Sequence, residues 1–217
     1  GGTESETFKV TLREPPLIER IDVIYKYPEY TGLAPQKVDG VGGEIRCLIG
    51  TTVEMTVSVS AAIEGGSVAF GRGEVLNSGR RTDDGRSVTF TFTVLANDTY
   101  QVHLAGQMTG GTAAVYRITA LDDKAPAVQF TMPNRDAAAA PGETVKMGLK
   151  ASDDYGLGEV RLMAQSDKED VPRVVTGWKK FADPKEAVID HAFAIDPGRY
   201  KLGQTIMYWA EAYDRRT

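Results

Sequence analysis

The chain has 217 residues with 30 acidic and 25 basic side chains, a formal net charge of −5 and 41% hydrophobic residues. This length suits two domains of about 100 residues each, and the apolar content is that of a folded protein. No basic cluster stands out, which argues against nucleic-acid binding. No apolar run approaches the roughly 20 residues of a membrane helix, so we expect no direct membrane insertion. The single cysteine, Cys47, excludes an internal disulfide.

The chain opens with an alternating segment, Thr7–Pro16, that ends in two prolines and is predicted to be a strand. We interpret residues 1–16 as a leading strand from the end of a preceding domain, the alternative being a simple N-terminal strand of the first domain. Residues 17–123 are predicted to form a first β-sandwich and residues 124–217 a second. A short acidic segment closed by Pro126 joins them.

Strict alternation of apolar and polar residues marks the strands of the first domain, over Gly50–Ser60, Ser87–Val94 and Tyr100–Leu104. A strand that is buried on one face only has this period. Short strands separated by glycine and aspartate turns are typical of an antiparallel sandwich, and no segment keeps a helical period. The predicted fold class is therefore all-β, with two antiparallel sandwiches in tandem.

The second domain repeats the first, because Gly142–Ser152 matches the run from Gly50 at an offset of 92 residues. A repeat of this length indicates tandem domains. The last strand, Ile206–Asp214, allows two registers: it matches the strand at Tyr116 at an offset of 92, or the strand at Tyr100 at an offset of 108. We favour the second register. It predicts that the final strand of the second domain lies beyond Thr217 and that an edge is left unpaired.

Several motifs resemble a known bacterial family. They are Tyr27–Leu33, Gly42–Ile45 and Gly50–Val53 in the first domain, with Lys150–Leu157 and Tyr208–Asp214 in the second. Together they are similar to a large, membrane-anchored, planctomycete-type family of unknown function. The resemblance covers most of the chain and implies consecutive immunoglobulin-like or fibronectin-type-III-like sandwiches outside the cytoplasmic membrane. It supplies no catalytic residues, and it implies that neighbouring domains of the same polypeptide are partners.

Catalysis finds little support in the sequence. It contains no G-x-S-x-G elbow, phosphate-binding glycine loop or H-E-x-x-H motif. Of the two histidines, His103 is predicted to face solvent and His191 to be partly buried, and neither has a converging nucleophile. Cys47 shares a face with Ile45 and Ile49 and is predicted to be a core residue. We expect neither enzymatic activity nor a cofactor.

Four aspartates are candidate ligands of a calcium ion. Asp122 and Asp123 lie at the junction, and Asp153 and Asp154 follow the repeated strand of the second domain. A linker and a neighbouring loop can together hold calcium, but calcium takes six to eight oxygens. The fuller D-x-N-D-N pattern is missing, and aspartate before glycine commonly caps a turn. We favour the turn and predict no metal, with these four residues as the calcium candidates and stability unchanged by a chelator.

Met207, Trp209 and Tyr213 are predicted to share an outward face, provided that Tyr208 and Ala210 face the core. An exposed aromatic stripe can bind a sugar or a partner protein. Cover by the segment that contains Trp178 and Phe181, or by a neighbouring module, is the favoured alternative. Two functions remain: a structural or interaction module of a larger extracytoplasmic protein, and, as the alternative, a module that binds cell-wall glycan or peptide on this face or on a sheet edge.

Overall fold

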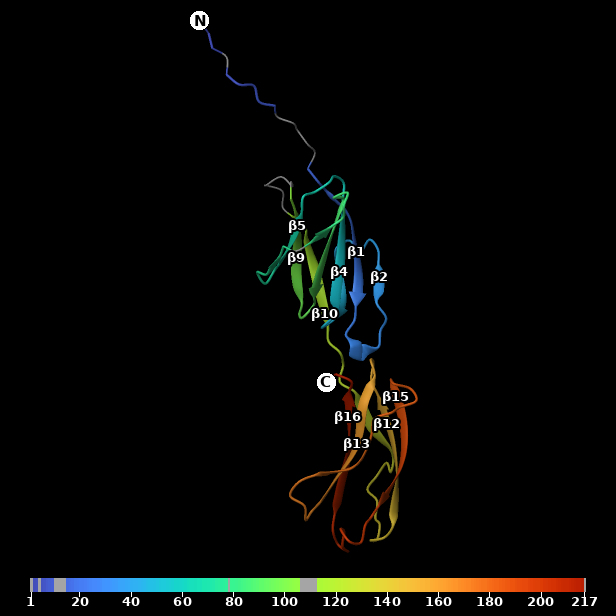
Figure 1. Ribbon diagram of the computed structural model, residues 1–217. Helices are drawn as coiled ribbons and strands as arrows, with labels where there is room; N and C mark the ends of the chain where they lie inside the picture. Colours follow the sequence, from blue (N-terminus) through green and yellow to red (C-terminus); the bar gives the residue numbers. More distant parts are fainter. Residues whose placement is uncertain (1, 4, 10–14, 78, 106–112, 217) are drawn as a thin grey trace. The chain divides into compact units, whose positions relative to one another are not determined.

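A computed structural model describes residues 2–3, 5–9, 15–77, 79–105 and 113–216. These residues confirm the all-β class, with sixteen strands and a single 3-10 turn, η1 (Glu29–Thr31). The chain divides into two compact units. We call Gly1–Tyr27 with Ala34–Leu121 the first sandwich, and Pro28–Leu33 with Asp122–Thr217 the second sandwich. Each is an antiparallel sandwich of the immunoglobulin-like type (Figure 1).

The first sandwich consists of two five-stranded sheets with the orders β2-β1-β4-β8-β7 and β3-β10-β9-β5-β6. The strand pairs are antiparallel except for β3 and β10, which run parallel. The strand bounds are β1 (Ile18–Lys26), β2 (Gln36–Val38), β3 (Ile45–Leu48), β4 (Thr52–Val59), β5 (Gly66–Phe70), β6 (Val75–Leu76), β7 (Arg80–Arg81), β8 (Ser87–Thr93), β9 (Asp98–Leu104) and β10 (Val115–Leu121).

The predicted alternation of β4 decides which residues enter the first core. Val53, Met55 and Val57 are fully buried, whereas the residues between them are half-buried on the outer face. The alternating residues of β8 and β9 meet them in one continuous apolar cluster. At its centre the fully buried Tyr100 donates its hydroxyl to the carbonyl of Gly43. The expected faces of these three strands are therefore confirmed.

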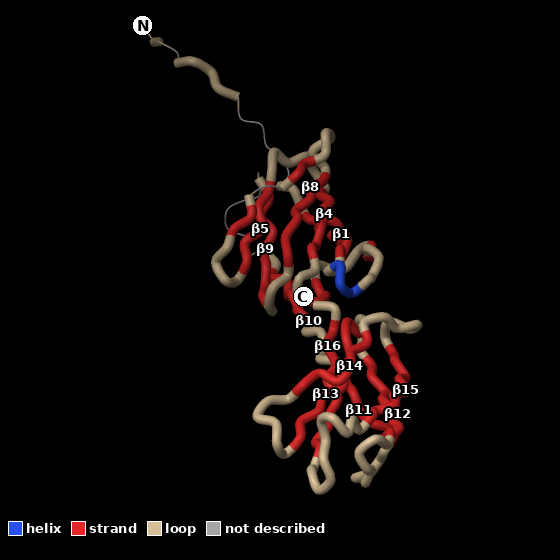
Figure 2. Tube along the Cα trace, turned by 60° about the horizontal axis from the view of Figure 1, so that its bottom comes forward, coloured by secondary structure: helices blue, strands red, loops and turns tan. Residues whose placement is uncertain are grey.

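The second sandwich consists of two three-stranded sheets with the orders β11-β12-β15 and β14-β13-β16 (Figure 2). Its core has two apolar clusters, one around Met147 and Phe193 and the other around Leu149 and Val160. The strand bounds are β11 (Ala127–Met132), β12 (Thr144–Ser152), β13 (Leu157–Ser166), β14 (Arg173–Trp178), β15 (Glu186–Ala194) and β16 (Ile206–Asp214).

The sheet orders confirm the register that we favour for the last strand. In the first sandwich, β9 pairs with β5, which follows β4 in the chain. In the second, β16 pairs with β13, which follows β12. Thus β16 corresponds to β9. The other edge of β9 pairs with β10, whereas within the described ranges no strand pairs with the other edge of β16.

Some local expectations differ from the structure. Thr7–Lys9 are not part of a strand and residues 10–14 lie outside the described ranges, so the leading strand of a preceding domain stays a prediction. An alternating sequence forms a strand only when a neighbouring strand accepts and donates its hydrogen bonds, and Thr7–Lys9 have none. Strands β5 and β14 were not predicted, because one begins in a glycine pair and the other breaks its alternation at Gly177. Ile49 follows β3 and is exposed instead of facing the core.

Candidate functional site

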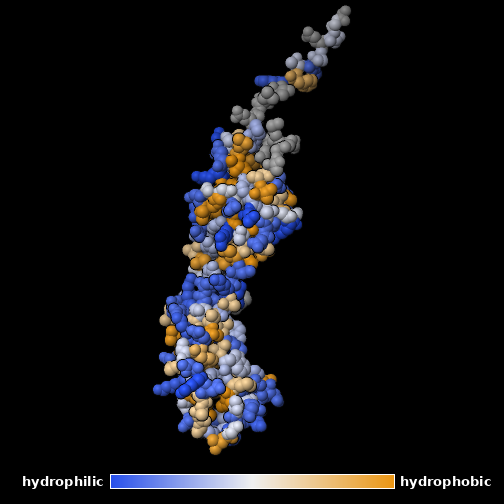
Figure 3. Space-filling model, turned by 180° about the vertical axis from the view of Figure 1, so that it is seen from behind, coloured by the Kyte–Doolittle hydropathy of each residue, from blue (hydrophilic) through white to orange (hydrophobic). Residues whose placement is uncertain are grey.

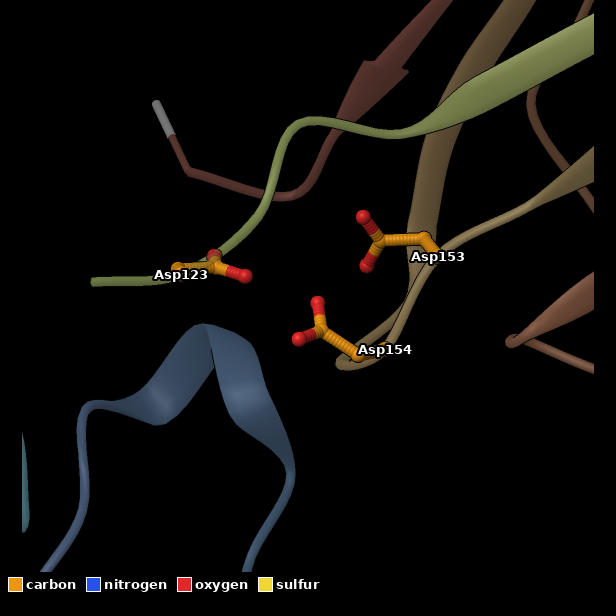
Figure 4. A group of neighbouring side chains, drawn as sticks. All are labelled: Asp123, Asp153 and Asp154. Atoms are coloured by element: carbon orange, nitrogen blue, oxygen red, sulfur yellow. The ribbon is translucent and has the colours of Figure 1, made fainter. Parts of the chain in front are cut away.

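Three of the four aspartates named from the sequence meet in the second sandwich. Asp123 lies just before β11, and Asp153 and Asp154 lie in the turn between β12 and β13. One carboxylate oxygen from each residue lies within 4.8 Å of the others. Figure 4 shows the three side chains directed toward a common point. We call these three residues the aspartate cluster; Asp122 is exposed and does not belong to it.

The turn between β12 and β13 explains one of these residues locally. Asp153 Oδ2 accepts hydrogen bonds from the backbone N–H groups of Tyr155, at 3.0 Å, and Gly156, at 2.5 Å. Gly156 has a φ of +134°, a backbone conformation that other residues rarely adopt. The predicted role of Asp153 as a turn cap is therefore confirmed. This role uses only one of its oxygens, because Asp153 Oδ1 is buried without a hydrogen-bond partner.

The side chain of Asp123 is also deeply buried, at 2% exposed. Arg216 forms an ion pair with it, with 3.2 Å between Arg216 Nε and Asp123 Oδ2. The same guanidinium also pairs with Asp214 at 2.8 Å. Neither oxygen of Asp123 accepts a hydrogen bond in the described part of the chain. A single cation is thus shared between the cluster and a fourth carboxylate.

The electrostatics of the cluster favour a proton or another positive charge. Burial raises the pKa of Asp123, and the neighbouring carboxyls of Asp154 and Asp153 raise it further, while Arg216 opposes them. Tyr30 of η1 also faces this carboxyl: burial raises the pKa of its hydroxyl first, and Asp123 adds to that increase. The causes of both shifts are loss of water around a charge and repulsion between like charges.

The predicted aromatic face lies on the outer side of β16. Met207 is 56% exposed and Tyr213 is 42% exposed, whereas Trp209 is less exposed and half-buried. Their polar groups are already occupied, since Trp209 Nε1 donates to Glu211 at 3.0 Å and the Tyr213 hydroxyl donates to the same carboxylate at 2.7 Å. The guanidinium of Arg161 lies 4.7 Å from the centroid of the Tyr213 ring. One face of that ring is therefore covered by a cation.

A cavity of about 800 Å³ opens in the second sandwich and was not predicted. Apolar side chains of four strands line it, and the loop after β11 adds Arg135 and Asp136. The volume is in the range of ligand pockets, and the lining is mixed apolar and polar. Its lining depends on contacts between residues far apart in the chain, so no local pattern could indicate it. Among the residues that line it are Phe130, Val145, Met147, Phe193 and Tyr208.

The remaining single-residue predictions concern groups with catalytic potential. His103 is exposed on β9, as predicted. His191 is half-buried against the edge of the Trp178 ring, 5.6 Å between centroids, and burial lowers its pKa. Cys47 is buried in the first core, where burial raises the pKa of its thiol. His191 and Cys47 therefore pack against their neighbours, whereas His103 lies on the surface.

On the face shown in Figure 3, hydrophilic and hydrophobic residues are interspersed over both units. Among the described residues, no helix has the length and apolar character needed to cross a membrane.

Comparisons with known proteins concern the fold. Neither a family model nor a curated protein matches the sequence. Among solved structures, the chain is similar to the adhesin InvE of Yersinia pseudotuberculosis, at 12% identity and a TM-score of 0.28 over 80% of this chain and 54% of that one. It thus spans about half the length of that adhesin chain.

Two further structures are similar at comparable levels. The DIP-gamma IG1+IG2 structure has 11% identity and a TM-score of 0.28 over 79% of this chain and 86% of that one. A chimeric titin Z1Z2-Z1Z2 tandem has 14% identity and a TM-score of 0.27 over 76% of this chain and 92% of that one. At these levels the likenesses carry no functional argument.

Proposed function

We propose that this chain is a non-catalytic structural or interaction module that spaces or presents parts of a larger extracytoplasmic, membrane-anchored protein. The observation that carries the proposal is that each sandwich contains its own core. The first apolar cluster draws only on residues of the first sandwich, and the other two draw only on the second. Self-contained sandwiches in series suit a chain whose role is to hold other parts apart or to offer surfaces.

The location and the family rest on the sequence. The motifs of Tyr27–Leu33 and Lys150–Leu157 resemble the extracytoplasmic region of a membrane-anchored bacterial family. Neighbouring domains of the same polypeptide are then the first partners to expect. The aromatic face supports a glycan site less well, because Glu211 already binds the polar groups of Trp209 and Tyr213. A sugar platform needs accessible ring faces and free polar groups beside them.

Tryptophan fluorescence with iodide quenching tests this proposal. Both tryptophans lie in the second sandwich, so Trp178→Phe and Trp209→Phe each leave one reporter there. We expect partial quenching of Trp209, weaker quenching of Trp178, and no change in either when cell-wall glycans are added. A saturable, glycan-specific protection of Trp209 would contradict the structural role and support glycan binding on the aromatic face.

A second candidate function is the binding of a peptide strand at the edge of β16 with which no described strand pairs. Two observations favour it. The corresponding strand of the first sandwich, β9, is covered at this edge by β10. The cavity is also lined by residues of both β11 and β16, so it lies beside the strand whose edge is unpaired. An added strand would gain backbone hydrogen bonds from β16 and place apolar side chains in the cavity.

A peptide with the sequence of β10, Val115–Leu121, is a suitable probe, because this strand covers the equivalent edge in the first sandwich. Titration into the labelled protein would be followed by the amide NMR signals. Strand addition predicts saturable shifts along β16 and around the cavity, and none with a scrambled peptide of the same composition. Equal responses to both peptides would leave only non-specific hydrophobic contact.

A further inference from the structure

The aspartate cluster contains buried oxygens that the fold does not satisfy. Asp153 is 8% exposed, and its Oδ1 accepts no hydrogen bond. The side chain of Asp123 is 2% exposed; Arg216 pairs with its Oδ2 at 3.2 Å, and its Oδ1 has no hydrogen-bond partner within the described residues. All three side chains point into the same space (Figure 4). Buried carboxylate oxygens without donors cost free energy, and the mutual repulsion of the three groups adds to that cost.

The positive charge near the cluster does not balance it. Among the described residues, Arg216 is the cation that forms an ion pair with it, and its two contacts with Asp214 are shorter than its contact with Asp123. One guanidinium thus faces four carboxylates. A divalent cation would offset two of the three negative charges of the cluster and leave Arg216 on Asp214.

We propose that Asp123, Asp153 and Asp154 bind one hard divalent cation of the calcium class. The donor set selects this class, because it consists of carboxylate oxygens alone. Calcium and magnesium prefer oxygen ligands, whereas zinc prefers nitrogen and sulfur. Calcium fits better than magnesium, because it tolerates irregular geometry, whereas magnesium demands a near-ideal octahedron. This inference goes beyond the structural role and does not depend on it.

The cation would connect two segments of the second sandwich. Asp123 belongs to the segment that enters β11, and Asp153 and Asp154 belong to the turn between β12 and β13. Because Asp153 Oδ2 already accepts two backbone hydrogen bonds, the protein offers fewer than the six to eight oxygens that calcium takes. Water must supply the rest, so we expect an affinity in the range of extracellular modules, with a Kd of about 10⁻⁴ to 10⁻³ M.

Thermal unfolding followed by tryptophan fluorescence tests the proposal, because both tryptophans lie in the same sandwich as the cluster. After treatment with EDTA, 10 mM calcium is expected to raise the Tm of this transition by on the order of 5 °C. Magnesium at the same concentration is expected to raise it less. Isothermal titration with calcium should give one site per chain.

Asp154→Asn is the decisive variant, since Asp154 is exposed and removal of its charge leaves the turn cap of Asp153 intact. The matched control is Asp190→Asn, which removes the same charge from an exposed position of β15. We expect Asp154→Asn to lose the calcium response and Asp190→Asn to keep it. The proposal fails if calcium has no effect on the wild type, or if both variants respond equally. It also fails if Asp154→Asn merely stabilises a protein that ignores calcium, which would indicate carboxyls that share a proton.

Discussion

Val57→Asp tests the assignment of the first core. Val57 lies in the middle of β4 with 0% of its surface exposed. The substitution removes about 1.5–3 kcal/mol of apolar burial. Keeping the new carboxyl protonated at pH 7 against an ordinary pKa near 3.9 costs about 4 kcal/mol more. The sum is about 5.5–7 kcal/mol, against a stability of about 5–15 kcal/mol for a domain of this size.

The variant should therefore lose most of the first sandwich at 37 °C while keeping the second. Far-UV circular dichroism should lose a large part of the β signal. Tryptophan fluorescence should stay native, because both tryptophans belong to the second sandwich and its core contains no residue of the first. Lowering the pH towards 4 should restore part of the signal, since protonation then costs less.

Ser58→Asp is the matched control, because it places the same side chain one residue later on the outer face, opposite Arg20. Its effect should stay within about 0.5 kcal/mol. A folded Val57→Asp protein would show that the faces of β4 are reversed. Loss of the native tryptophan signal as well would show that the two cores do not fold independently.

Three further predictions concern single positions. Gly43→Ala would place a Cβ 2.0 Å from the Tyr116 ring at a φ of +89°, so it should lower the free energy of unfolding by about 2–5 kcal/mol. Gly40→Ala is the control: its φ is +64° with open space around it, and it should lower the free energy of unfolding by about 1 kcal/mol. Equal urea midpoints for the two variants would refute the clash with Tyr116. Cys47 should resist thiol reagents in the native protein and react only on unfolding, because it is buried and its pKa is raised; stoichiometric labelling of the native protein would contradict its core position. Asp123→Asn should stabilise the calcium-free protein at pH 7, because the folded state raises the pKa of Asp123 and ionisation of this carboxyl therefore disfavours folding. The gain in stability of the variant over the wild type should shrink as the pH falls towards 3.8, the ordinary pKa of an aspartate.

Much of the fold could be predicted because alternation reports directly on a half-buried strand. Strands β4, β8 and β9 carry unbroken alternation, and their inward residues form the first core. The weaker strands β5 and β14 depend on neighbours for their definition. The turn Pro28–Leu33 belongs to the second sandwich although β1 and β2, which flank it, belong to the first. A local sequence pattern contains no information on where such a turn packs.

The candidate site could be predicted only as a set of residue names. Asp122 and Asp123 are adjacent and chemically identical, yet one is exposed and the other has a side chain that is 2% exposed. That difference arises from the packing of the chain before β11 against a turn about 30 residues away, which no spacing rule specifies. The turn cap of Asp153, in contrast, follows from the local Asp-Asp-Tyr-Gly sequence and was predictable.

A buried aspartate elsewhere in the chain has hydrogen-bond or ion-pair partners for both of its oxygens, which the aspartate cluster lacks. Asp22, in the first sandwich, is as buried as Asp153. One of its oxygens pairs with Arg20 at 2.7 Å, and the other accepts a hydrogen bond from the backbone N–H of Gly40 at 2.8 Å. The fold thus satisfies a buried aspartate completely where it serves structure alone. An asparagine or serine in place of Asp153 could cap the same turn without adding charge. Three clustered carboxylates, two of which have buried oxygens that accept no hydrogen bond from the described residues, exceed what the turn needs, and such local conflicts are expected where a protein binds something.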